Sequence, residues 1–117
     1  MLVWWAAEIE CISALSRLER SGTLDLEGTK AALAQLDRLR SSWAELEPSA
    51  AVRIHARRLP RVHPLTAADA FRLAAALVAA EGRPSDLPFV TLDRRLADAA
   101  HREGLPVVVP ASASEQP

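Results

Sequence analysis

The sequence predicts an α/β domain in which a parallel sheet is flanked by helices. Short apolar runs alternate with longer segments in which apolar residues recur every three or four positions. Strands that are separated by helices pair in parallel, because each helix returns the chain to the same end of the sheet. The 117 residues suit one domain with a single core. We expect this domain to span residues 1–110, and the small, polar residues 111–117 to form a disordered tail.

The first half of the chain is predicted to contain one strand and two helices. Residues 1–5 form an apolar run typical of a strand. Residues 6–21 have helical spacing, and Gly22 ends this segment. Asp25 can cap a second helix. The buried side of that helix is expected to hold four leucines: Leu26, Leu33, Leu36 and Leu39.

The second half alternates helices with short strands. After an extended link at residues 46–48, Ser49 begins a helix that Pro60 bends or ends. Thr66 begins the most hydrophobic helix, which is expected to run to Glu81. A buried strand over residues 89–92, a helix over 94–103 and a last strand over 106–109 complete the prediction.

Composition excludes several classes of protein. The net charge of −1 provides no overall basic field for nucleic-acid binding, although thirteen of the fourteen basic residues are arginine. The single cysteine, Cys11, cannot form an internal disulfide and is expected to be a small core residue. No apolar run is long enough to span a bilayer. We therefore expect a cytoplasmic protein.

Two aspartates lie where helices are predicted to begin, and each has two interpretations. Asp69 follows Thr66 at capping-box spacing, so it can satisfy a backbone amide or serve as a metal ligand. Asp93 lies between a strand and a helix, where it can be an N-cap. That position is also the carboxyl end of a parallel strand, where α/β proteins bind ligands. The residues alone leave both interpretations open.

Glu10 is the third candidate, in the first turns of the first predicted helix. It can be a surface acid that complements the helix dipole, or it can join the two aspartates. Three carboxylates near helix starts suit a hard cation such as Mg²⁺.

Three blocks of sequence resemble PIN-domain ribonucleases of the VapC toxin type: residues 10–18, 65–76 and 89–97. The resemblance extends from Val3 to Val109. It implies an endoribonuclease of a toxin–antitoxin pair that cleaves RNA by metal-assisted hydrolysis with Mg²⁺ or Mn²⁺. When the three blocks are matched to the family, Glu10, Asp69 and Asp93 correspond to three of its catalytic, metal-binding acids. Thr91 corresponds to a hydroxyl residue that precedes the last of these acids. A small antitoxin and a homodimer are the implied partners.

The family's first strand, which carries an Asp followed by Ser or Thr, has no counterpart in this sequence. The resemblance therefore implies a PIN-like sheet that is truncated at its N-terminus, either because the chain starts inside a longer protein or because it is a shortened relative. One alternative is an inactive module that binds an antitoxin or a full-length toxin. Another is a helical interaction protein in which every acid is a cap.

Overall fold

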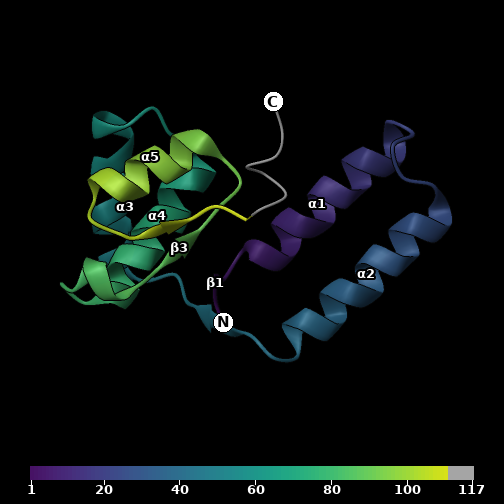
Figure 1. Cartoon of the computed structure of the whole chain (residues 1–117), viewed down its shortest axis with the longest axis horizontal. Coiled ribbons are helices and arrows are strands. Elements are labelled where there is room, and N and C mark those ends of the chain that lie inside the picture. Colours follow the sequence, from purple (N-terminus) through teal and green to yellow (C-terminus); the bar gives the residue numbers. More distant parts are fainter. Residues whose placement is uncertain (111–117) are drawn as a thin grey trace. The chain divides into compact units, whose positions relative to one another are not determined.

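The computed structural model describes residues 1–110, which form five α-helices and four short strands. The chain divides into two compact units, Met1–Glu47 and Pro48–Pro117 (Figure 1). Every strand pairs in parallel. The predicted mixed α/β class and the parallel pairing are therefore confirmed.

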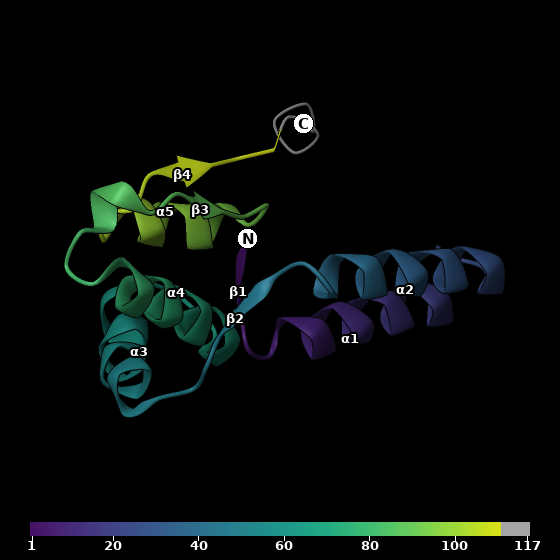
Figure 2. The same cartoon turned by 90° about the horizontal axis from the view of Figure 1, so that it is seen from below.

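The first unit is a helical hairpin joined to a two-stranded sheet. Its elements follow the order β1 (Leu2–Trp4), α1 (Ala7–Arg20), α2 (Leu26–Arg40) and β2 (Ala44–Leu46). The two helices run antiparallel beside each other (Figures 1 and 2). An ion pair of 3.1 Å between Arg40 Nε and Glu8 Oε1 joins the end of α2 to the start of α1. β1 pairs with β2, with Leu2 opposite Ala44.

Local sequence signals predict the two helices of this hairpin correctly, but they do not predict which of its residues are buried. Gly22 has φ +81° in the turn after α1, and Asp25 Oδ1 accepts a hydrogen bond of 2.7 Å from Gly28 N at the start of α2. Of the four predicted core leucines, however, Leu36 alone is buried, while Leu26 is 58% exposed. Cys11 is exposed, so its predicted core role is wrong. The reason is that no residue of α1 is buried, since a two-helix hairpin covers only part of each helix.

Two packed helices form the base of the second unit. α3 (Ala50–Val62) begins at Ser49, whose hydroxyl accepts a hydrogen bond from Val52 N. α4 (Ala67–Ala80) begins at Thr66 in the same way, as predicted. α3 and α4 lie side by side in both views (Figures 1 and 2).

Pro60 lies inside α3 and does not end it. The helix continues to Val62, whereas the sequence predicts an end or bend at Pro60. A proline in the last turn removes one backbone donor, the N–H that would bond to the carbonyl of Ala56. Burial of Leu59 on one side of Pro60 and of His63 on the other holds this last turn in place.

The rest of the second unit is a short helical turn, two strands and a helix: η1 (Pro84–Asp86), β3 (Phe89–Val90), α5 (Arg94–Arg102) and β4 (Val107–Val108). β3 pairs with β4, with Phe89 opposite Val107. Helix α5 contacts both strands and α4. The core of this unit is built around four fully buried leucines: Leu59, Leu73, Leu96 and Leu105.

The strands differ from the prediction in length and burial. The segment at residues 89–92 was expected to be buried, yet Val90 is 62% exposed and Leu92 66% exposed. β2 was not predicted as a strand, and only its last residue, Leu46, belongs to the extended link expected at residues 46–48. The strands of the described residues form two sheets of two strands each. The PIN-like sheet therefore stays a prediction, and the predicted tail at residues 111–117 lies outside the described residues.

Candidate functional site

Asp93 occupies the turn between β3 and α5. Its Oδ1 accepts a hydrogen bond of 2.9 Å from Arg95 N and a longer one of 3.4 Å from Leu96 N, so it is the N-cap of α5. Thr91 Oγ1 in turn accepts a hydrogen bond of 3.1 Å from Asp93 N. The capping interpretation of Asp93 is confirmed, and its side chain lies at the carboxyl end of a parallel strand.

Asp69 lies in the first turn of α4. Its backbone N–H donates to Thr66 Oγ1 at 3.2 Å, which makes Thr66 the N-cap. Its carboxylate forms an ion pair with Arg72, in which Nη1 and Oδ1 are 2.8 Å apart. The Asp69 side chain is 13% exposed and that of Arg72 is 38% exposed, so this pair is partly shielded from water.

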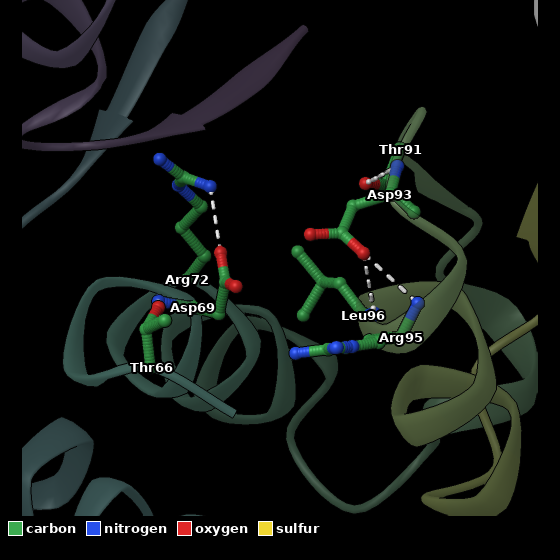
Figure 3. Close-up of polar contacts among 7 residues, drawn as sticks. All are labelled: Thr66, Asp69, Arg72, Thr91, Asp93, Arg95 and Leu96. Atoms are coloured by element: carbon green, nitrogen blue, oxygen red, sulfur yellow. Dashed lines mark hydrogen bonds and ion pairs between the residues drawn. The ribbon is translucent and has the colours of Figure 1, made fainter. Parts of the chain in front are cut away.

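The two aspartates belong to the same unit and to helices that touch each other. Helix α4 contacts α5, and both helices begin near these side chains. In Figure 3 the carboxylate of Asp93 projects from the start of α5 on the side toward α4, and the carboxylate of Asp69 projects from the first turn of α4. Both acids therefore lie at the positive end of a helix dipole, where negative charge is favoured.

Glu10 lies in the first turn of α1, as expected, and its backbone N–H donates to the carbonyl of Ala6. It belongs to the first unit, whereas Asp69 and Asp93 belong to the second. Within residues 1–110, no group of three or more histidine, cysteine, aspartate or glutamate side chains is arranged to hold a metal ion. The three-acid metal site remains a prediction from the sequence.

A second polar cluster, which the sequence did not indicate, joins α3 to the end of α5. Glu103 accepts two hydrogen bonds from Arg58, at 2.7 and 3.0 Å, through its two carboxylate oxygens. His63 Nε2 lies 2.7 Å from Glu103 Oε2. The His63 side chain is only 4% exposed. Glu103 is therefore not a solvated surface acid, because its carboxylate joins α3 to the end of α5.

The pKa of the Glu103 carboxylate is strongly shifted by its two partners in this cluster. The hydrogen bonds from Arg58 and, to a smaller extent, the bond with His63 together lower the pKa of Glu103 from 4.5 to about 2, against the opposing effect of burial. The same contact raises the pKa of Arg58. Glu103 is therefore fully ionised near neutral pH, which suits a structural brace rather than a proton-transfer group.

Comparison with known proteins does not assign the chain to a family. No protein-family model matches the sequence, and no curated protein is significantly similar to it. No helix among residues 1–110 combines the length and the hydrophobicity that crossing a membrane requires.

Proposed function

We propose that the chain is a Mg²⁺-dependent endoribonuclease of the VapC toxin type, in which Asp69 and Asp93 hold the metal. The observation that supports this most directly is the position of Asp93. It lies at the carboxyl end of a parallel strand and at the start of α5, which contacts the helix that carries Asp69. Ligands of α/β proteins bind at this end of the strands.

The donor set has the chemistry that Mg²⁺ requires. Magnesium is commonly held by one or two carboxylates, together with water and substrate phosphate oxygens. Asp93 uses Oδ1 for its cap, which leaves Oδ2 able to face a cation. A metal held there would activate water and offset the charge that develops on the phosphate. Glu10 is the third proposed ligand, and Mn²⁺ is the alternative ion.

The Arg72 side chain would compete with such a cation for the Asp69 carboxylate. Its guanidinium forms an ion pair with the Asp69 carboxylate, so a bound cation would repel it. Arginine is also the side chain best suited to grip a phosphate with two parallel hydrogen bonds. In this proposal Arg72 turns from Asp69 to the RNA backbone when substrate and metal enter.

One observation favours a second candidate, a non-catalytic module that binds an antitoxin or a full-length toxin. Both aspartates already have local partners, Asp93 as a cap and Asp69 with Arg72. The predicted antitoxin and homodimer belong to both candidates, so partner binding does not separate them. Metal binding and RNA cleavage do.

The test measures cleavage of a fluorescent RNA with Mg²⁺ or Mn²⁺ by the chain and by Asp69→Asn and Asp93→Asn. At Asp93, asparagine preserves the cap of α5 but removes the charge. At Asp69, where Thr66 is the cap, asparagine keeps the size of the side chain and removes the charge that pairs with Arg72. A loss of cleavage in both variants therefore reports the metal role. We expect each variant to lose activity by about a hundredfold or more. Asp98→Asn, an exposed acid on α5, is the matched control and should keep full activity.

A binding experiment completes the test. Titration with Mn²⁺, followed by calorimetry, should give heat for the chain and for Asp98→Asn but not for Asp93→Asn. The nuclease proposal fails if the chain shows no metal-dependent cleavage, or if the asparagine variants cleave as well as the parent. Absence of both cleavage and Mn²⁺ binding would exclude the nuclease and leave a non-catalytic protein.

A further inference from the structure

Helix α3 has a basic outer face with no counter-charge of its own. It carries four arginines, Arg53, Arg57, Arg58 and Arg61, and no acidic residue. Arg58 is engaged by Glu103. Within the described part of the chain, neither Arg57 nor Arg61 is in an ion pair. Arg57 and Arg61 are four residues apart on one helix face, where like charges destabilise a helix.

Two exposed apolar side chains flank these charges. Ile54 is 69% exposed and Val62 is 58% exposed. The opposite side of α3 buries Val52 and Leu59 against the rest of the unit, so the outer face is not needed for its core. With the arginines, these side chains line an open depression of about 700 Å³ along the helix: Ile54, Arg57, Arg58, Arg61 and Val62.

The distribution of charge over the chain supports an acidic partner. The second unit has nine basic and seven acidic side chains, whereas the first has five basic and eight acidic ones. The excess positive charge of the second unit thus resides largely in α3. An anionic partner would relieve the repulsion along the helix, and charge complementarity would guide its approach.

We propose that this face of α3 binds an acidic amphipathic helix of another protein. Glutamate or aspartate side chains of the partner pair with Arg57 and Arg61, and its leucine-type side chains cover Ile54 and Val62. The exposed apolar pair favours a protein over a nucleic acid, because a phosphate backbone would leave both side chains uncovered. The surface shares no residue with the proposed metal site, so this inference stands apart from the nuclease activity.

The probes are a synthetic helical peptide with leucine and glutamate at alternating turns, its Glu→Gln counterpart, and a single-stranded RNA oligonucleotide. Fluorescence anisotropy measures binding of each to the full chain. We expect the acidic peptide to bind, and the Gln peptide to bind about tenfold more weakly or not at all. Rising salt should weaken the acidic peptide's binding.

Three variants locate the surface. Arg57→Gln combined with Arg61→Gln, and Ile54→Ser combined with Val62→Ser, should each weaken binding of the acidic peptide about tenfold. Arg53→Gln is the matched control, because Arg53 is an exposed arginine of the same helix that does not line the depression. It should leave binding unchanged. Circular dichroism should show the same helix content in all three.

Each other outcome overturns the proposal. RNA binding that depends on Arg57 and Arg61 but not on Ile54 and Val62, without peptide binding, would mean that the face is a nucleic-acid surface. An equal loss with Arg53→Gln would mean that general positive charge, and not the depression, attracts the peptide. No binding of either probe would mean that the face is ordinary solvated surface.

Discussion

The contact of Glu103 with Arg58 and His63 leads to a specific prediction about stability. Glu103→Gln removes the charge and keeps the size of the side chain. Because the pKa of Glu103 falls from 4.5 to about 2 in the folded chain, the ionised carboxylate favours folding by roughly 3 kcal/mol at most. Arg58 is 45% exposed, and water screens its share of the interaction. We therefore expect Glu103→Gln to lower the free energy of unfolding by about 1–2 kcal/mol near neutral pH.

The lowered pKa of Glu103 also predicts how the stability difference between the parent chain and Glu103→Gln changes with pH. A carboxylate with a lowered pKa stabilises the folded state fully above its unfolded value of 4.5, and this contribution is lost as the pH falls toward 2. The parent chain and Glu103→Gln should therefore differ in stability near neutral pH. The difference should shrink below pH 4.5 and vanish near pH 2.

The assay must measure the stability of the second unit. All three tryptophans, Trp4, Trp5 and Trp43, lie in the first unit, so tryptophan fluorescence would follow the wrong part of the chain. Hydrogen exchange of the α3 and α5 amides, measured across the pH range, reports the cluster directly. Glu19→Gln, an exposed acid on α1, is the control and should leave α3 and α5 unchanged. A stability difference that persists undiminished near pH 2 would refute the electrostatic explanation.

Two further predictions concern the cap of α5 and the core of the second unit. Asp93→Ala should cost about 1 kcal/mol of stability and Asp93→Asn only a few tenths, because asparagine still accepts the bonds from Arg95 N and Leu96 N; equal losses in thermal unfolding followed by circular dichroism would contradict the capping role. Leu73→Ala should cost about 2–4 kcal/mol in the same assay, because Leu73 is fully buried and its truncation leaves a cavity. Val90→Ala, at a 62% exposed position, should cost much less, and a loss as large as that of Leu73→Ala would mean that β3 is covered.

The sequence alone determined where the helices begin. Of the five α-helices among residues 1–110, all but α1 start at a side chain that bonds a backbone amide two or three residues further on, so a short stretch contains the whole signal. Four such residues were predicted and confirmed: Asp25, Ser49, Thr66 and Asp93. The alternation of helices and apolar runs likewise predicted parallel pairing, which both sheets show. The candidate acids were located by the same local reasoning.

Only the tertiary structure decided which residues are buried and which distant partners meet. β2 is a strand because β1 lies beside it, since its own three residues carry no strand pattern. Leu26 and Val90 are apolar yet exposed, because burial depends on what covers a face and not on the periodicity within it. Arg58 and Glu103 are 45 residues apart in sequence, and the bond between them exists only because α3 and α5 fold into one unit. Local hydrogen bonds could be inferred from the sequence, whereas these long-range contacts depend on how the elements assemble.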